Sequence, residues 1–531
     1  MSTPKKNTTK ANNIVTIVHV ALICIVFAWA YSYTFNPKLD LNGDNAKYIE
    51  LARSLAGGHG FATEGTHFAR VPHTHFPPGY PVLLSVPILL GADNLILFKV
   101  MNGLMMLAGI LLFYFAMLKT SGSKAVAYAA GLISAMSPQL LKFATMAMSE
   151  MSFMFFMMLS LFAMSRMLDE KRQFGPWFWV ACAGAAACYY IRAAGSAVIF
   201  SVLVFYLFRK EWKRAAVSVG TVVALYLPWF IRNKVIGHGR SYMSYILARN
   251  PWRPEEGSIS SVPEFLRKVW TNLNDTTLSG YVKIFCPSWK GYGSENLSPV
   301  FIVIGFAVLA IVLWGLWSNR TMRFALLGLL VANTGLLLIW NGGNDIRYVT
   351  PFVPLVIYGF WNGIYSLIAL MVPERKRGRI AFVPYLAVFS VLAFGTELNV
   401  EHKFAKAGLL KVYADYYEAA KTLNDASSPG AKPVVACRKP ELFKFYAPKT
   451  VPVMFASTQD GRALIKNLLD NEVDFVVLDH LGFSSTVRYL VPAIKDYPYF
   501  FQTVKEFSSD GTRKTLLLRF KRDLAETCFE K

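Results

Sequence analysis

The sequence predicts a mainly α-helical membrane protein with about eleven transmembrane helices, two interfacial helices on the outer face and a C-terminal soluble α/β domain. Of its 531 residues, 54% are hydrophobic and only 17% are charged, a much smaller charged share than soluble proteins have. Apolar runs long enough to cross the ~30 Å hydrocarbon core recur along the first three quarters of the chain. Beyond about residue 396 they stop, and the composition becomes that of a soluble domain.

Eleven apolar segments are predicted to cross the membrane in alternating directions. They are residues 14–35, 95–118, 125–141, 151–167, 177–191, 193–208, 215–230, 300–317, 324–340, 348–372 and 380–394. Basic residues gather in the connections at alternate crossings, as Lys119 with Lys124 and Arg209 with Lys210 illustrate. Cytoplasmic loops carry an excess of Lys and Arg, and the N-terminal segment before the first span is also basic, so the N-terminus is predicted to be cytoplasmic. The formal net charge of +22 is therefore mostly a topology signal, which argues against nucleic-acid binding.

Two long connections, residues 36–94 and 232–296, fall on the outer side in this topology. The first contains two predicted interfacial helices, 44–56 and 80–90. Within 44–56, Tyr48, Leu51 and Leu55 recur at helical spacing, which places them on one face of a helix lying along the membrane surface. The segment 80–90 is apolar but too short to span the bilayer.

The C-terminal segment is predicted to be a separate domain, so the chain divides into residues 1–396 and 397–531. Helices are expected at 409–424 and 461–469, and strands at 433–437, 473–479 and 515–520, an alternation typical of α/β domains. The topology places this domain in the periplasm or outside the cell. Cys286, Cys437 and Cys528 lie outside the predicted spans. At most one disulfide joins these three residues, and the sequence does not decide which pair.

A set of ionisable residues maps to the outer ends of the predicted helices or to the outer loops. None of these residues lies midway along a span. They are Asp44, Lys47, Lys99, Lys142, Glu150, Arg192, Asp345 and Arg347. Such groups are costly in a membrane and mark functional sites. An enzyme acting on a lipid headgroup needs them at one face, whereas a transporter places them near the bilayer midplane. The pattern favours an enzyme and leaves a transporter or flippase as the alternative.

Several of these residues also have a purely structural explanation. Asp44 and Lys47 share one helix face, where the ammonium keeps the carboxylate ionised and able to accept a proton. Asp44 is equally suited to cap the helix 44–56. Glu150 is either a second acid of the same cavity or a favourable charge at a helix N-terminus. Arg192 either binds phosphate or extends to the membrane interface.

The first outer loop and the segment 344–348 hold further candidates. Four histidines cluster in that loop: His59, His67, His73 and His75. His73 and His75 are spaced so that both imidazoles point to one side of an extended segment, as in a metal site. No matching pair completes such a site, so solvated loop histidines are the simpler interpretation. Arg347 is either paired with Asp345 or available to bind phosphate.

At these positions the chain resembles a known superfamily. The segments that carry the resemblance are NGDNAKYIELARSLAGGHGF (42–61), FPPGYPVLL (76–84), MSEMSFMFFMMLSLF (148–162), YYIRAAG (189–195), LPWFIRN (227–233) and IRYVTPFVP (346–354). In order, spacing and topology they are similar to the multispanning glycosyltransferases of fold type C. The nearest group is family 39, with the protein O-mannosyltransferases and the bacterial lipid A aminoarabinose transferase. The tail shows no β-trefoil repeat, which disfavours the O-mannosyltransferase subtype.

The resemblance implies transfer of a hexosyl or pentosyl group from a polyprenyl-phosphate carrier to a hydroxyl acceptor, with inversion at the anomeric carbon. Asp44 would be the general base and Glu150 the second acidic position. The residues that match or lie near substrate-binding and phosphate-binding positions are Lys47, Tyr48, His75, Arg192, Arg347 and Tyr348. His75 stands where the aminoarabinose transferase has a Lys, which would make binding sensitive to pH.

The resemblance also implies the partners and the location. The partners are a polyprenyl-phosphate-linked sugar, membrane lipids and an acceptor that is a lipid, a glycan or a protein, and the location is the inner (plasma) membrane. The donor sugar, the acceptor, the oligomeric state and the need for a divalent metal ion stay open. No cofactor and no metal ligands are assigned.

Overall fold

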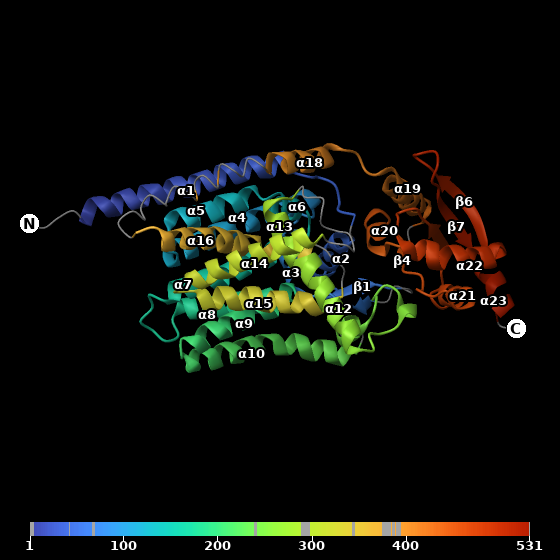
Figure 1. The fold of residues 1–531 in the computed structure, drawn as a ribbon. Coiled ribbons are helices and arrows are strands. Elements are labelled where there is room, and N and C mark those ends of the chain that lie inside the picture. Colours follow the sequence, from blue (N-terminus) through green and yellow to red (C-terminus); the bar gives the residue numbers. More distant parts are fainter. Residues whose placement is uncertain are drawn as a thin grey trace, which may run out of the picture.

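The computed structural model describes residues 5–41, 43–65, 70–237, 242–287, 298–341, 346–373, 394–428 and 430–529, together with positions 384 and 388. Figure 1 shows a bundle of long helices that run roughly parallel, with a smaller region containing a β-sheet at one end of the bundle. The predicted span 380–394 lies almost entirely outside the described residues.

Within the described ranges, six helices are long and apolar enough to cross a membrane. They belong to α1 (Lys5–Thr34), α4 (Leu95–Thr120), α7 (Glu150–Met167), α10 (Trp212–Ile236), α14 (Pro299–Ser318) and α16 (Val353–Met371). Four shorter helices fall at further predicted spans: α5 (Lys124–Met136), α8 (Pro176–Ile191), α9 (Gly195–Phe208) and α15 (Arg323–Ile339). The chain is therefore a mainly helical protein with several helices able to span a bilayer, and the count of eleven crossings stays a prediction.

Prolines account for two differences from the predicted spans. The predicted segment 125–141 is broken into α5 and α6 (Pro138–Ala144), because Pro138 disfavours helical backbone at Ser137. Ser137 has extended backbone and its hydroxyl accepts the Leu140 N–H. The predicted segment 348–372 begins as two 3₁₀ turns, η4 (Ile346–Tyr348) and η5 (Thr350–Phe352), and α16 follows them. Pro351 and Pro354 occupy first-turn positions of η5 and α16, where a missing N–H is tolerated.

The outer connections contain most of the remaining elements of the bundle. In the first, the predicted interfacial helices are α2 (Asp44–Ala56) and α3 (Gly79–Leu89), and β1 (Ala62–Glu64) pairs antiparallel with β2 (Arg70–Pro72). In the second, the sequence pattern did not reveal three helices: α11 (Tyr242–Leu247), α12 (Val262–Asn272) and α13 (Ser279–Phe285). Two short turns also lie there, η2 (Pro254–Glu256) and η3 (Leu273–Leu278).

The C-terminal region, residues 395–428 and 430–529, holds a five-stranded sheet of order β4-β3-β5-β7-β6. Its strands are β3 (Val434–Ala436), β4 (Val451–Val453), β5 (Phe475–Leu478), β6 (Phe501–Phe507) and β7 (Thr515–Phe520). β3 pairs parallel with β4 and β5, whereas β7 pairs antiparallel with β5 and β6. Its helices and turns are α18 (Gly395–Lys406), α19 (Lys411–Ala426), α20 (Pro440–Tyr446), α21 (Gly461–Asp470), η8 (Thr486–Leu490), α22 (Val491–Asp496), η9 (Pro498–Phe500) and α23 (Arg522–Phe529). The predicted helices and strands of this region are all present.

Ion pairs join the C-terminal region to both outer connections. Glu64 of β1 pairs with Lys432, and its second oxygen lies 2.8 Å from Lys444 Nζ. In the other connection, Glu255 lies 3.0 Å from Arg488 Nη1 and accepts a hydrogen bond from the Tyr489 hydroxyl. These contacts place the C-terminal region against the end of the bundle that carries α2 and α3, as Figure 1 shows.

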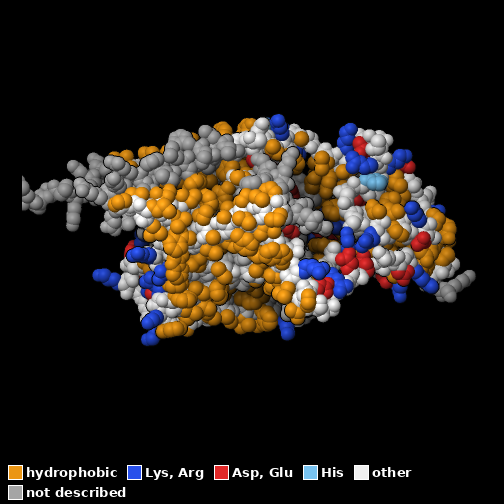
Figure 2. Space-filling model, viewed as in Figure 1, with side chains coloured by type: hydrophobic (Ala, Val, Ile, Leu, Met, Phe, Trp, Pro, Cys, Tyr) orange, Lys and Arg blue, Asp and Glu red, His pale blue; other side chains and the backbone are white. Residues whose placement is uncertain are grey.

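The side of the bundle is covered by apolar side chains. Figure 2 shows a broad hydrophobic surface over the helices, with Lys and Arg at the end of the bundle opposite the C-terminal region. Val223 on α10 and Val300 and Val303 on α14 are each more than half exposed. A soluble monomer rarely exposes such a surface, so it marks the part of the molecule that faces lipid.

Helices α14 and α16 approach closely through three glycines. A Cβ on Gly315 would lie 1.8 Å from the carbonyl oxygen of Gly359 and 2.5 Å from the amide nitrogen of Gly363. Small residues at such crossings allow helix backbones to touch in a membrane. By contrast, a Cβ on Gly335 in α15 would meet nothing within 4 Å.

Gly315→Ala is therefore expected to force α14 and α16 apart and lower the melting temperature of the detergent-solubilised protein. Gly335→Ala is the matched control, and it should leave the melting temperature unchanged or slightly higher, since Ala favours a helix by about 1 kcal/mol over Gly. Equal melting temperatures for the two variants would contradict this packing.

Candidate active site

Arg347 joins two carboxylates that come from distant parts of the chain. Its Nη1 lies 2.6 Å from Oδ2 of Asp44 at the start of α2, and its Nε donates to Oε1 of Glu150 at the start of α7. The short η4 turn brings Arg347 to this place, and the whole residue is only 8% exposed. The cation thereby links the first outer connection, the N-terminus of α7 and the entry to α16.

Glu150 is fully buried and is held by two guanidinium groups. Arg192 Nη1 lies 2.6 Å from the same Oε1 that Arg347 contacts, and it also donates to the Ser149 hydroxyl at 3.0 Å. A buried carboxylate needs such partners, because a charge without them is very costly away from water. Among the described residues, Glu150 Oε2 has no hydrogen-bond partner. Because Glu150 is buried and paired with two guanidinium groups, its position suits it to hold the arginines of the site in place.

Asp44 is the more open of the two acids, with 29% of its side chain exposed. The residue before it, Gly43, has φ +97°, a backbone conformation suited to glycine. No side chain caps the N-terminus of α2. The alternative that Asp44 is a helix cap is therefore not what the structure shows, because its carboxylate pairs with Arg347 instead. Ser149 likewise makes no side-chain cap on α7, where Glu150 faces the arginines.

Tyr48 and its neighbours form an aromatic and polar frame beneath the charged groups. The Tyr48 hydroxyl lies 3.4 Å from the Ser149 hydroxyl, and its ring packs against Phe76 and edge-on against Tyr80. Asn102 on α4 donates to the Tyr80 hydroxyl at 3.1 Å and to the carbonyls of Met146 and Met148. This network fixes α2 against the start of α7.

The structure thus brings Asp44, Tyr48, Glu150, Arg192 and Arg347 together and places His75 near Asp44, whereas Lys47 and Tyr348 have other partners. Lys47 pairs with Glu50 at 2.8 Å on its own helix. The ring of Tyr348 packs edge-on against Trp340 at 6.4 Å between centroids. His75 lies between Phe76 and Tyr245. Asp345, the alternative partner of Arg347, is outside the described residues.

His73 is half-buried and His75 keeps much of its side chain exposed, and partial desolvation makes both favour the neutral form. Burial lowers the pKa of His73 to about 3, and the nearby cations Lys47 and Arg232 add to that effect. The neutral ring accepts the Phe76 N–H at 3.0 Å. Burial also lowers the pKa of His75, although the facing carboxylates of Asp44 and Glu441 oppose the shift. His75 is therefore suited to donate a hydrogen bond as a neutral ring. His59 and His75 are exposed, as the sequence suggested for loop histidines, whereas His73 is half-buried and His67 lies outside the described residues.

Arg232, which the sequence analysis did not single out, ties the two outer connections together. Its Nη1 donates to the His73 carbonyl at 3.0 Å and its Nη2 to the Phe61 carbonyl at 2.9 Å. Its guanidinium also stacks over Trp229, 4.6 Å from the ring centre. The sequence did contain a signal for Arg232: in the segment 227–233 this arginine stands one helical turn beyond Pro228. Its task is to hold the loop that carries His75.

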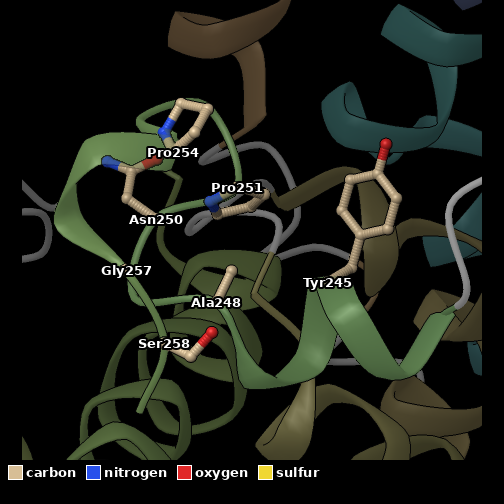
Figure 3. Close-up of a pocket in the computed structure, with 7 residues that line it drawn as sticks. All are labelled: Tyr245, Ala248, Asn250, Pro251, Pro254, Gly257 and Ser258. Carbon is tan, nitrogen blue, oxygen red and sulfur yellow. The ribbon is translucent and has the colours of Figure 1, made fainter.

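A pocket of about 300 Å³ opens in the second outer connection and is lined by Tyr245, Ala248, Asn250, Pro251, Pro254, Gly257 and Ser258. Figure 3 shows Tyr245 on one side of it and Asn250 and Pro254 on the other. Because Tyr245 contacts His75, with 6.4 Å between ring centroids, the pocket adjoins the charged cluster. A second pocket, of about 430 Å³, is lined by Phe115, Leu118, Lys119, Phe162 and Arg166 at the far end of α7.

The structure also bears on metals and disulfides. Within the described parts of the chain, no group of three or more His, Cys, Asp or Glu side chains is arranged to hold a metal ion. All six cysteines are free thiols, with Cys437 buried and Cys286 and Cys528 exposed. The sequence left the pairing of these three open, and the structure joins none of them.

Glu150→Ala is expected to leave Arg192 and Arg347 buried without their shared carboxylate, and to lower the free energy of unfolding by about 3–5 kcal/mol. The measurement is denaturant unfolding in mixed micelles. Glu418→Ala, which removes a carboxylate from an exposed pair with Lys421, is the control and should have little effect. Similar destabilisation by both variants would contradict the role given to the buried pair.

The neutral state of His73 predicts a pH dependence of stability. In the unfolded chain this imidazole takes up a proton near pH 6.5, whereas in the folded protein it does so only near 3. The unfolded state therefore binds more protons below pH 6.5, so this stabilising contribution is complete above that pH and is lost as the pH falls toward 3. His73→Asn removes the titration, and its stability should fall less steeply than that of the wild type between pH 7 and 4.5. Parallel curves would contradict the assignment.

No protein-family model matches the sequence, and no curated protein matches it. Solved structures do match the fold. The oligosaccharyltransferase AglB from Archaeoglobus fulgidus, in complex with an inhibitory peptide and a dolichol-phosphate, superposes with a TM-score of 0.58 at 12% identity, covering 94% of this chain and 74% of that one. ArnT from Cupriavidus metallidurans, bound to undecaprenyl phosphate, superposes with a TM-score of 0.55 at 14% identity, covering 95% and 97%. The chain has the type C fold of these glycosyltransferases.

Proposed function

We propose that the chain transfers a sugar from a polyprenyl-phosphate carrier to a hydroxyl acceptor at the outer face of the plasma membrane, with inversion. The observation that carries this proposal is the Asp44–Arg347–Glu150–Arg192 cluster, in which the most open group is a carboxylate lying 2.6 Å from a guanidinium. Two structures with the same fold contain polyprenyl phosphates, dolichol-phosphate in AglB and undecaprenyl phosphate in ArnT. Their presence supports a lipid-linked donor for this chain.

In the proposed reaction, Asp44 is the general base. The acceptor hydroxyl oxygen forms a bond to the anomeric carbon from the face opposite the carrier, and its proton passes to the Asp44 carboxylate. The bond between the anomeric carbon and the phosphate oxygen breaks, and its electron pair leaves with the carrier phosphate. Negative charge grows on that phosphate, so fixed cations at the leaving side lower the barrier. One base removes the proton and one displacement occurs, which accounts for a single inversion.

The other residues have distinct proposed tasks. Arg347 pairs with the Asp44 carboxylate and would also contact the leaving phosphate. Glu150 and Arg192 fix Arg347 from the buried side. His75, neutral and facing Asp44, would donate a hydrogen bond to the headgroup or the sugar. Lys47 pairs with Glu50 and Tyr348 packs against Trp340. In this proposal they bind substrate only if they give up those contacts.

The same proposal fixes the topology. With eleven crossings and a cytoplasmic N-terminus, α2, α3 and the C-terminal region lie on the periplasmic or extracellular side. Lys119, Arg166 and Arg209 end α4, α7 and α9 at the other face, as the excess of cytoplasmic basic residues requires. The charged cluster lies at helix ends and in the η4 turn rather than at mid-helix, which favours an enzyme over a transporter.

Asp44→Asn is expected to lower sugar transfer by about 10²- to 10⁴-fold, because the amide cannot accept the acceptor's proton. Its oxygen can still accept a hydrogen bond from Arg347, so the variant should fold. The measurement uses purified protein and a panel of undecaprenyl-phosphate-linked hexoses and pentoses, with released undecaprenyl phosphate as the readout. Asp523→Asn, an exposed position on α23, is the control. Normal carrier release by Asp44→Asn would reject the mechanism.

A further inference from the structure

The C-terminal sheet presents charged residues at the carboxyl ends of its parallel strands. Arg438 and Lys439 follow β3 after one residue, and Asp479 directly follows β5. Ligands of open α/β sheets bind outside the carboxyl ends of parallel strands, where the backbones diverge. This edge of the sheet meets the bundle, because α20 begins at Pro440 and packs against α2. The edge is therefore both suited to bind a ligand and close to Asp44.

Lys439 is held firmly in this edge. The Tyr416 hydroxyl donates to the Lys439 carbonyl at 3.0 Å and lies 3.3 Å from the Lys439 amide nitrogen, so one buried side chain fixes the backbone on both sides. The ammonium lies 4.6 Å from the centre of the Phe483 ring, and the Arg438 guanidinium lies 4.4 Å from the same centre. Two cations that share one ring repel each other, and a bound anion would relieve that repulsion.

The side chain of Lys439 reaches the first residues of the active site. A Cβ on Gly43 would lie 3.8 Å from Lys439 Nζ and 3.8 Å from Glu441 Oε2. Gly43 is the residue before Asp44, and the positive φ of Gly43 turns the chain into α2. The carboxylates of Asp44 and Asp40 act on Lys439 electrostatically. Asp44 thus pairs with Arg347 of the bundle and lies one residue from the position that Lys439 of the C-terminal region reaches.

We propose that Lys439 binds the phosphate of the carrier substrate beside Asp44, so that the C-terminal region supplies part of the substrate site. This inference rests on the proposed function. The phosphate bears the charge that grows as the bond to the sugar breaks. The Lys439 backbone is fixed by Tyr416 and its ammonium lies over the Phe483 ring, so little rearrangement is needed to meet that charge. Burial and the nearby Arg438 lower the pKa of Lys439, and the carboxylate of Glu441, on the first turn of α20, opposes that shift.

The test measures binding of undecaprenyl phosphate to the full-length protein in lipid nanodiscs. Lys439→Gln keeps a side chain of similar length without the charge and is expected to weaken binding at least tenfold, the range for a lost charge-assisted hydrogen bond. Lys439→Arg restores the charge and should bind within about threefold of wild type. Lys466→Gln, at an exposed position on α21, is the control and should bind as wild type does. Melting temperatures of all four proteins confirm that each is folded.

The outcomes separate this inference from the proposed function. Equal binding by wild type and Lys439→Gln would overturn the role of Lys439 and leave Asp44 chemistry intact. Equal loss in Lys439→Gln and Lys439→Arg would overturn it too, since the charge would then not be what binds. A weaker affinity for the acceptor alone, with carrier binding unchanged, would assign Lys439 to the acceptor and reject the proposal. Wild-type protein that does not bind undecaprenyl phosphate would reject the proposed function itself.

Discussion

The pairing of Arg347 with both Asp44 and Glu150 is the constraint on which the end of the bundle next to the C-terminal region depends. Three chain segments that are far apart in sequence meet at one guanidinium, and Glu150 is buried completely. A buried ion pair adds little net stability, because desolvation offsets most of the attraction, yet removing one partner is severely destabilising. The cluster is therefore better understood as a way to fix α2, α7 and η4 in one arrangement. Asp44 stands at its open edge, where a substrate can reach it.

Much of this site could be predicted from the sequence, because charged residues next to apolar spans must lie at the membrane surface or in a polar site. Asp44, Glu150, Arg192 and Arg347 all flank predicted helices on one side, and α2 has the predicted bounds. Which acid meets which base could not be predicted, since the pairs join residues about 40 to 300 positions apart. The short strands β4 and β6 gave no clear period-two signal, and β4 has Pro452 at its centre. The sequence analysis did not single out Lys439, because nothing in the local sequence indicates that the segment after β3 lies near α2.

The C-terminal region is attached in a way that relates it to the site. Glu64 holds Lys432 and Lys444, Glu255 holds Arg488 and Tyr489, and α20 lies against α2. Each contact lies on an outer connection rather than on a lipid-facing helix. The apolar side of the bundle stays free for lipid (Figure 2), and polar contacts are concentrated where the carrier headgroup would lie. If the bundle only anchored the C-terminal region to the membrane, the position of Lys439 beside Gly43 would have no explanation.

The most direct test of this account is an experimentally determined structure of the protein with undecaprenyl phosphate bound. The account predicts the phosphate within hydrogen-bond distance of Arg347 or Lys439 and next to the Asp44 carboxylate, with the polyprenyl chain running along the apolar surface of the bundle. A phosphate bound at the opposite end instead, in the pocket beside Lys119 and Arg166, would contradict the central claim. In that case the role of Arg347 would be only to hold α2, α7 and η4 together, and not to bind substrate.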